Sequence, residues 1–560
     1  MYIGPPFLVS QCVDGGRTGQ VAGVPGTGDF RPRCAAPAGA DARGMNGSWA
    51  DVHETHIGVV FLVGDLAYKL KKPVDLGFLD FSARETRERV CHREVELNRR
   101  LAPDVYLGVA DVTGPDGAVR DHLVVMRRMP EDRRLSTLVR ERAPLHLATR
   151  RLARQLAAFH ARAERGPEID ADETRDAVRG RWRDSFEQVR PFHDDVLDAA
   201  TALEIEALAE EFLAGRKPLF DRRIAEGHVV DGHGDLLADD VFCLDDGPRV
   251  LDCLEFDDHL RHVDVLDDIA FLAMDLERLD APELGEQLLL DYREFSGDPT
   301  PPTLVHHYLA YRAFVRVKVA CLRHAQGDTG AAPLAREYAD LALWHLRLGR
   351  VRLVLVGGEP GTGKSTIAGG LADRLGATLL QSDRIRKELA GLTPARRPPE
   401  GYRQGLYDAR HTDATYAELV RRAGELLALG ESVVLDASWT AARHRAPAAE
   451  VAERTDSPLV AVRCHAPEET AARRITTRTG ALSDATPEIA HRMAADADPW
   501  PEAHPLPTSG SPAESLARAV AALVPEHRKS PVLRHSGPPG AGNRGARVEA
   551  DDIPDPEAGR

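Results

Sequence analysis

Two features that would place a protein in a membrane or outside the cell are missing from this 560-residue sequence. Its longest apolar stretches, such as Val59–Val63, are far too short to cross a bilayer. The opening residues lack the basic region and the apolar run of a signal peptide. The seven cysteines are scattered, with no C-x-x-C pair, which is typical of reduced thiols. We therefore expect a cytoplasmic protein that is not bound to a membrane.

An excess of positive charge is also missing. The 88 acidic residues outnumber the 72 basic ones, and the formal net charge is −16. This balance argues against a nucleic acid or an anionic membrane as the main partner. The composition, with 43% hydrophobic and 29% charged residues, is ordinary for a globular protein, and the chain is too long for one core. We expect at least two domains and leave the oligomeric state open.

Four regions follow one another along the chain. Residues 1–50 and 526–560 are rich in Gly, Pro and Ala without a hydrophobic period, and we expect them to be disordered. Met45 is an alternative start. Residues 51–349 predict a small sheet followed by a large helical lobe, the layout of a protein-kinase-like fold. Residues 350–525 alternate strands and helices, which predicts a parallel three-layer domain. The fold class is therefore multidomain, α+β followed by α/β.

A phosphate-binding loop is the strongest motif in the sequence. Residues 358–366 read GEPGTGKST, follow an apolar strand and open a predicted helix that ends at Leu375. The glycines let backbone N–H groups surround phosphate oxygens, Lys364 reaches the β and γ phosphates, and Ser365 holds Mg²⁺. The motif predicts ATP and Mg²⁺ as ligands. The residues expected at the nucleotide are Gly358, Glu359, Pro360, Gly361, Thr362, Gly363, Lys364, Ser365 and Thr366.

A second acid completes this expected magnesium site. Asp436 ends the apolar strand VVLD, where an acid of the Walker B type orients the ion. A solvated aspartate at a strand end is the alternative interpretation.

The motif QSDRIRK, at residues 381–387, adds a resemblance to small-molecule P-loop kinases such as gluconate kinases. The resemblance implies that Asp383 accepts the proton of the substrate hydroxyl and that Arg386 and Lys387 contact the acceptor. For Asp383 the alternative is an N-cap of the next helix. The resemblance also implies lid arginines that stabilise the transferring phosphoryl group, for which Arg474 and Arg478 qualify; a solvated basic face is the alternative.

The stretch DGHGDLLADD, at residues 231–240, resembles the HGDLHxxN signature of aminoglycoside and choline phosphotransferases. The resemblance implies that Asp235 takes the acceptor proton and that Asp240 binds the metal ion. The sequence departs from the signature twice, with Leu237 in place of His and Asp240 in place of Asn. Asp252 and Glu255 both qualify by spacing as the second metal acid, and we prefer Asp252.

This kinase fold also requires a strand lysine and a helix glutamate that holds it. AYKLKKP supplies Lys69, Lys71 and Lys72, of which Lys69 and Lys71 share one side of the strand. We select Lys69, with Glu94 as its partner and Glu96 as the second choice. Lysine is scarce in this chain, with only eight, at 69, 71, 72, 217, 318, 364, 387 and 529. In a chain that uses arginine for most of its basic residues, a lysine is expected where a compact ammonium is needed, and this supports the choice of Lys69. Chance clustering of the lysines is the alternative.

Over about residues 55–505 the chain resembles a bacterial fusion of an aminoglycoside-phosphotransferase-like domain with a P-loop ATP-binding domain. The resemblance implies an ATP-dependent phosphotransferase with two nucleotide sites that acts on hydroxyls of small molecules, sugar-, aminoglycoside- or gluconate-like. A nucleotide-sensing regulator with one inactive domain is the alternative; a protein kinase ranks low because the set H-R-D, D-F-G and A-P-E is incomplete, with neither H-R-D nor D-F-G in the sequence. The charge of the acceptor stays open. A cation would suit an acidic pocket from Asp257, Asp258, Asp264, Asp267 and Asp268, whereas Arg312, Arg316 and Lys318 favour an anion.

Overall fold

The computed structural model describes residues 7–8, 21–22, 51–54, 57–75, 80–393, 403–477 and 486–523. From the expected disordered extension 1–50 it describes only the strands β1 (Phe7–Leu8) and β2 (Val21–Ala22), which pair with β3 and β6. The expected tail 526–560 lies outside the described residues. Disorder in both segments stays a prediction.

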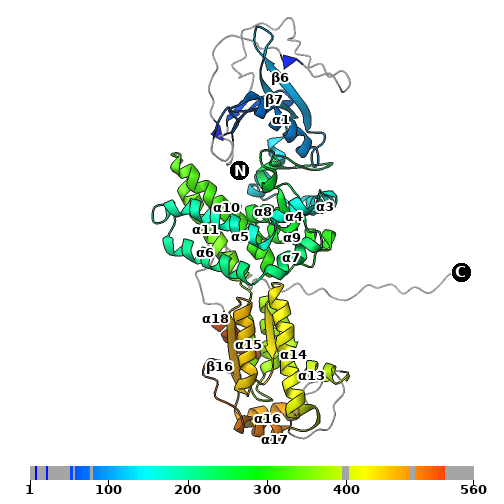
Figure 1. Ribbon diagram of the computed structural model, residues 1–560, viewed down its shortest axis with the longest axis vertical. Helices are drawn as coiled ribbons and strands as arrows, with labels where there is room; N and C mark the ends of the chain where they lie inside the picture. Colours follow the sequence, from blue (N-terminus) through cyan, green and yellow to red (C-terminus); the bar gives the residue numbers. More distant parts are fainter. Residues whose placement is uncertain are drawn as a thin grey trace, which may run out of the picture. The chain divides into compact units, whose positions relative to one another are not determined.

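The first domain begins with an antiparallel sheet, drawn in blue in Figure 1. Its order is β1-β3-β4-β5-β7-β6-β2. The hairpin predicted from the sequence is confirmed, since β4 pairs with β5 and the turn contains Gly64 with a φ of 57°. The helix predicted from Ser82 is also confirmed, and it packs on β6 and β7. The bounds are β3 (Asp51–Glu54), β4 (Gly58–Val63), β5 (Leu66–Lys71), α1 (Arg84–Asn98), β6 (Tyr106–Thr113) and β7 (Val119–Arg127).

A helical lobe follows and carries two short antiparallel pairs, β8–β11 and β9–β10. The strands are β8 (Val229–Asp231), β9 (Val241–Leu244), β10 (Gly247–Val250) and β11 (His262–Asp264). The helices are α2 (Leu135–Arg140), α3 (His146–Arg162), α4 (Pro167–Asp172), α5 (Arg175–Val189), α6 (Ala199–Ala214), α7 (Lys217–Ala225), α8 (Val265–Arg278), α9 (Pro282–Ser296), α10 (Pro302–Ala325) and α11 (Ala331–Leu348).

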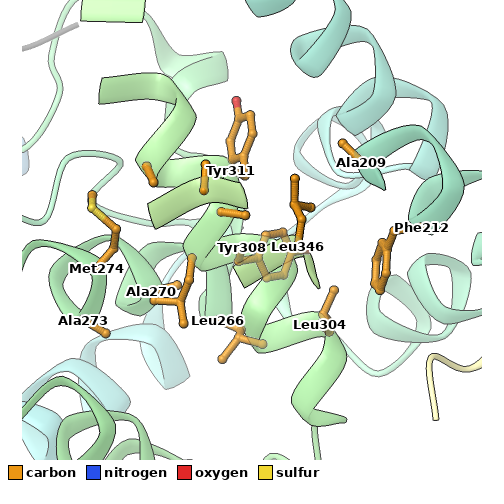
Figure 2. Close-up of a cluster of buried hydrophobic side chains, with 14 of the residues drawn as sticks. Ala209, Phe212, Leu266, Ala270, Ala273, Met274, Leu304, Tyr308, Tyr311 and Leu346 are labelled. Atoms are coloured by element: carbon orange, nitrogen blue, oxygen red, sulfur yellow. The ribbon is translucent and has the colours of Figure 1, made fainter. Parts of the chain in front are cut away.

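Helix α8 lies in the middle of this lobe. Every residue from Val265 to Leu276 is buried, and Figure 2 shows side chains of α8 among those of α6, α10 and α11. Burial on all sides is typical of such a central position. Its acids Asp267, Asp268 and Asp275 are therefore buried as well and need partners inside the protein.

The second domain has a sheet of five parallel strands in the order β13-β14-β12-β15-β16. The strands are β12 (Leu353–Gly357), β13 (Thr378–Gln381), β14 (Val433–Asp436), β15 (Leu459–His465) and β16 (His504–Pro507). The helices are α12 (Lys364–Leu375), α13 (Ser382–Leu389), α14 (Ala409–Ala428), α15 (Ala442–Arg454), α16 (Glu468–Thr477), α17 (Pro487–Ala495) and α18 (Pro512–Leu523).

The two faces of this sheet are covered by different helices. Val354 and Val356 belong to a buried cluster with Leu371 of α12 and Leu523 of α18. The alternate residues of the same strand, such as Leu355, belong to a cluster that includes residues of α14 and α15. The predicted three-layer α/β domain is thereby confirmed. Helix α11 ends at Leu348 and β12 begins at Leu353, so the boundary predicted at 349/350 falls in the connection, and it stays a prediction.

No helix within the described segments is long and apolar enough to cross a membrane.

Candidate active sites

In the first domain, the HGD loop leaves β8 and is fixed by Asp268 of α8. The carboxylate of Asp268 accepts the backbone N–H of His233 at 2.7 Å and that of Gly234 at 2.9 Å. His160 lies 3.0 Å from the same carboxylate and contacts the Tyr292 hydroxyl at 2.8 Å. Burial opposes the charge of Asp268, but the bonds from His160 and the loop outweigh it and hold its pKa below the usual range. The loop is therefore rigidly positioned.

Asp235, the candidate base, lies on this loop with only 5% of its surface exposed. Its Oδ2 atom has no hydrogen-bond partner among the described residues. Burial raises the pKa of Asp235 to about 6, against the opposing charges of Arg316 and Arg312. A buried carboxylate with a free oxygen and a pKa near neutrality is suited to accept a proton from a substrate hydroxyl.

The two candidate metal acids of this domain lie close enough to Asp235 to act on its charge. Asp240 ends the short helix η3 (Ala238–Asp240), and its Oδ2 atom likewise lacks a protein partner. Burial raises the pKa of Asp240 well above its usual value, and the charges of Asp252 and Asp235 raise it further. Asp252 has a left-handed φ of 64°, and its N–H is bonded to the Tyr106 hydroxyl at 3.1 Å. Because buried free carboxylate oxygens are costly, this arrangement fits a divalent cation.

A compact ionic cluster connects these acids to β5. The Lys69 ammonium lies 2.5 Å from Asp252 and 2.9 Å from Glu94 Oε1. Lys71, on the same side of the strand as predicted, lies 2.6 Å from Glu94 Oε2 and also pairs with Glu255. Burial opposes the charge of Lys69, yet the pKa of Lys69 is held well above its usual value by Asp252 and Glu94. Each oxygen of Glu94 thus holds one lysine.

The alternatives within this set have different partners. Glu255 pairs with Lys71, whereas Asp252 pairs with Lys69 and its charge acts on Asp240; our preference for Asp252 stays a prediction. Glu96 is exposed and pairs with Arg93 instead of a lysine of β5. Lys72 pairs with Glu54 near the surface.

An open pocket lies beside Asp235, with about 610 Å³ of space when the solvent at its mouth is included. The acids proposed as a cation-binding pocket do not form one, because each has a structural partner. Asp267 binds Arg312, Asp264 binds Arg223, Asp258 binds Arg261, Asp268 holds the HGD loop, and Asp257 caps η4 (Asp258–Leu260). Among the five, only Asp267 lines the pocket beside Asp235, and it is paired with Arg312.

In the second domain, the phosphate-binding loop joins β12 to α12 as predicted. Gly361 and Gly363 have left-handed φ values of 84° and 86°. A side chain at Gly361 would bring a Cβ within 2.5 Å of the Ala471 carbonyl, so only glycine fits. The loop is held by the Thr362 hydroxyl, which bonds the Glu359 carbonyl at 2.7 Å, and by Thr508, which bonds the Thr362 carbonyl at 2.6 Å.

Asp436 lies next to the start of α12. Burial raises the pKa of Asp436, while the charge of Lys364 and a hydrogen bond from Ser365 oppose the rise. Its Oδ2 atom accepts a bond from Gln381 at 3.2 Å, and its Oδ1 atom is without a partner in the described part of the chain. Asp436 is buried, so the alternative of a solvated strand-end aspartate is wrong. A buried free oxygen beside Ser365 fits a magnesium ligand.

Asp383 lies in the first turn of α13, and its negative charge adds to the rise in the pKa of Asp436. The N-cap of α13 is Gln381, so the alternative of an N-cap role for Asp383 is wrong. Arg386 and Lys387 are buried; Arg386 donates to the Leu406 carbonyl at 2.9 Å. Both side chains therefore lie inside the domain, on the same helix as Asp383.

Arg474 of α16 reaches the phosphate-binding loop. It donates to the Thr508 carbonyl at 2.7 Å and to the Gly361 carbonyl at 3.5 Å. This position supports a contact with bound phosphates, and it disfavours a purely solvated face. Arg478 lies outside the described residues.

The sequence analysis missed the supporting role of Asp268 and did not name His160 or Asn98. Asp268 and His160 hold the HGD loop, and Asn98 Oδ1 accepts the Cys253 N–H beside Asp252 at 2.9 Å. The apolar surroundings of Asp268 on α8 were a signal of its burial, whereas no local pattern marks His160 or Asn98.

A cluster of metal-binding side chains also escaped the sequence analysis. Within the described residues, one group of three such side chains could share a metal ion, namely Asp172, His259 and His262. Asp172 there already bonds both histidines.

Comparisons with known proteins found a family model that matches part of the second domain and solved kinase structures of low similarity. Residues 353–499 match the model of the AAA domain family described as "AAA domain". The choline/ethanolamine kinase family protein from Mesorhizobium loti is 16% identical, covering 56% of this chain and 91% of that chain, with a TM-score of 0.34. A gluconokinase from Sinorhizobium meliloti is 20% identical, covering 31% of this chain and 91% of that chain, with a TM-score of 0.23.

Relatives over most of the chain come from mycobacteria. The uncharacterized protein Rv2004c of Mycobacterium tuberculosis and the uncharacterized protein Mb2027c of Mycobacterium bovis are each 44% identical over 469 residues. The alignments cover 84% of this chain and 94% of each relative. The chain therefore belongs to the family of these mycobacterial proteins.

Proposed function

We propose that the protein is a phosphotransferase with two ATP sites, which transfers the γ-phosphoryl group to hydroxyls of small molecules that are sugar-, aminoglycoside- or gluconate-like. One observation carries the proposal. Each domain has buried carboxylate oxygens without a partner among the described residues: those of Asp235 and Asp240, which lie within reach of the charge of Asp252, the partner of Lys69, and that of Asp436, on which the charge of Lys364 acts. Such oxygens are expected where a cation and a reacting hydroxyl bind.

In the first domain, Lys69 would bind the α and β phosphates, and Glu94 would orient Lys69. Asp240 and Asp252 would hold Mg²⁺, which neutralises charge on the phosphates when it is bound. The acceptor oxygen forms a bond to the γ phosphorus, the bond to the bridging oxygen breaks, and ADP leaves. Asp235 takes the proton that the hydroxyl releases.

In the second domain, the backbone N–H groups of residues 358–366 would surround the phosphates. Lys364 and Arg474 would stabilise charge on the transferring group, with Arg478 as a further candidate. Ser365 and Asp436 would hold Mg²⁺, and Asp383 would accept the acceptor proton. Arg478 lies outside the described residues and is a candidate from the sequence alone.

The alternative is a nucleotide-sensing regulator whose first domain is inactive. Its support is the departure from the HGD signature at Leu237, which is buried in the helical core. The two proposals differ in turnover. We expect the intact protein with Mg²⁺-ATP to phosphorylate members of a panel of sugars, sugar acids and amino alcohols. The double variant Asp235→Asn/Lys364→Ala should lose all acceptor-dependent ADP formation; nucleotide binding without turnover in the unchanged protein would favour the regulator.

A further inference from the structure

Two histidines and an aspartate meet at the pocket beside Asp235. Asp172 ends α4, His259 lies in η4, and His262 begins β11. The Oδ2 atom of Asp172 lies 2.8 Å from Nδ1 of His259 and 2.6 Å from Nδ1 of His262. Both histidines line the pocket, as Asp235 does. Three atoms of the kind that bind metal ions are therefore gathered at the wall of this pocket.

The loop that carries the two histidines is anchored between them. The side chain of Arg261 has no exposed surface, and it bonds Asp231 and the Leu254 carbonyl, each at 2.8 Å. Asp257 accepts the backbone N–H of His259 at 3.0 Å. The backbone of the loop is thus fixed before a ligand binds, which lowers the entropic cost of binding.

The aspartate is held separately, through the end of its own helix. Arg181 of α5 donates to the backbone carbonyl of Asp172 and pairs with the buried Glu173. Helix α4 also packs on β8 and on β11, the strand that His262 begins. The carboxylate of Asp172 therefore has a defined position next to the histidine loop.

The present contacts are hydrogen bonds that a metal ion would replace. In a tetrahedral zinc site with bonds of about 2.0–2.2 Å, two ligand atoms lie roughly 3.3–3.5 Å apart. The two nitrogen atoms would therefore have to separate from Oδ2 of Asp172 by roughly 0.5–1 Å. The side chain of His259 is 76% exposed and that of Asp172 is 25% exposed, so both have room to rotate by this amount.

The chemistry of the three atoms selects the kind of ion. Two imidazole nitrogens and one carboxylate oxygen suit Zn²⁺ and similar transition-metal ions, whereas Mg²⁺ prefers oxygen ligands. The candidate magnesium acids Asp240 and Asp252 offer oxygen atoms alone, so the two sites differ in kind. Three protein ligands leave the fourth position of a tetrahedral ion open, and we expect water or a molecule in the pocket to fill it.

We propose that Asp172, His259 and His262 bind one transition-metal ion of the Zn²⁺ class at the pocket wall, through Oδ2 and the two Nδ1 atoms. The ion would connect α4 to the loop that joins η4 to β11. Its open position would take an oxygen or nitrogen atom of a molecule in the pocket. The inference does not depend on the proposed phosphotransferase function, because it rests on ligand atoms that the proposed chemistry does not use.

Binding of the metal alone tests the site on the full-length protein. After dialysis against a chelator, the protein is titrated calorimetrically with Zn²⁺ in excess Mg²⁺, which occupies sites made of oxygen atoms only. We expect one Zn²⁺ per chain that Mg²⁺ does not displace, and a visible spectrum of four-coordinate Co²⁺ when Co²⁺ is used instead. Zn²⁺ should also raise the melting temperature, because it binds the folded chain.

Variants of the histidines then tie the binding to the site. His259→Gln and His262→Gln should each weaken Zn²⁺ binding by more than the about 10- to 100-fold typical of losing an outer-shell partner. Because His259 is exposed, its variant should keep the melting temperature of the metal-free protein. His491→Gln is the matched control, since His491 forms an exposed pair with Glu468 at 3.0 Å outside the three-ligand group, and it should retain Zn²⁺ binding.

Three outcomes would overturn the site. These are no Zn²⁺ bound beyond what the double variant His259→Gln/His262→Gln retains, displacement of the ion by Mg²⁺, and an equal loss in His491→Gln, which would mark adventitious binding to surface histidines. Zn²⁺ binding without any acceptor-dependent ADP formation would leave the site standing and would count against the proposed function alone.

Discussion

The two domains hold their candidate nucleotide sites in contrasting ways. In the P-loop domain the phosphate contacts come from one continuous segment, residues 358–366, whose backbone shape is set by glycines and by bonds such as that from Thr508. In the first domain the equivalent groups come from β5, α1 and two loops, and they meet only through the ion pairs of Lys69 and Lys71. A site built from the backbone of one segment can be recognised from the local sequence. A site built from side chains of several elements depends on the tertiary structure.

This contrast predicts different sensitivities. Replacing one side chain in the first domain should either stop chemistry or upset a buried charge balance. Changes that support the P-loop backbone should act more gradually, because several N–H groups share the phosphates.

The largest effect is expected at the HGD loop. Asp235→Asn removes the proton acceptor while keeping the size of the side chain, so acceptor-dependent ADP formation by the first domain should fall about 10²- to 10⁴-fold. The affinity for Mg²⁺-ATP should change little. Stopped assays in the Lys364→Ala background measure the rate, and titration with an ATP analogue measures binding.

Asp245→Asn is the control for this change, because the side chain of Asp245 is 86% exposed and pairs only with Arg133 among the contacts described. Full activity of Asp235→Asn would place the chemistry of the first domain elsewhere.

A change in the P-loop should come next. Lys364→Ala removes the ammonium expected at the β and γ phosphates, and we expect a loss of affinity in this domain of about a hundredfold or more, the scale of two lost charge-assisted bonds. Titration should then show one tight site per chain instead of two. Lys217→Ala, at an exposed lysine of α7 paired with Asp221, should retain both.

A stoichiometry of one in the unchanged protein, abolished by Lys364→Ala and unaffected by Lys69→Met, would contradict a nucleotide site in the first domain and favour the regulatory alternative.

The two lysines of β5 should separate stability from binding. Lys71 has no exposed surface and holds Glu94 and Glu255, so Lys71→Met leaves buried carboxylates short of a partner and should destabilise the first domain by about 3–5 kcal/mol. Lys69→Met should chiefly weaken ATP binding. Thermal unfolding with and without the ATP analogue measures both effects, with Lys72→Met near the surface as the control.

If Lys71→Met were as stable as the unchanged protein while Lys69→Met unfolded, the assignment of the nucleotide lysine would be reversed.

Much of this organisation could be predicted from the sequence, and the failures have a common cause. The phosphate-binding loop and the pairing of β4 with β5 rest on local pattern, so their positions agree with the structure. The alternation of a strand also placed Lys69 and Lys71 on one side. What it could not supply is that both reach Glu94, because that depends on how α1 approaches the sheet.

The acids of α8 also show that the sequence does not reveal which side chains pair in the folded protein. As a run of charges, Asp267 and Asp268 suggested part of an acidic pocket, yet Asp267 neutralises Arg312 and Asp268 fixes the HGD loop. The many apolar residues beside these acids in the sequence pointed to burial of the helix.

The smallest predicted effect tests the claim that the P-loop is held through its backbone. Thr508 donates its hydroxyl to the Thr362 carbonyl at 2.6 Å and contacts the His465 carbonyl at 3.0 Å. Thr508→Val keeps the shape but removes this donor, which should cost about 0.5–1.5 kcal/mol and loosen the loop from β16. We therefore expect ATP affinity in the Asp235→Asn background to fall only a few-fold, with the stoichiometry unchanged. Thr476→Val on α16, whose hydroxyl bonds carbonyls of its own helix, is the matched control. A loss as large as that of Lys364→Ala would contradict a shared backbone cradle and would make Thr508 a direct determinant of nucleotide binding.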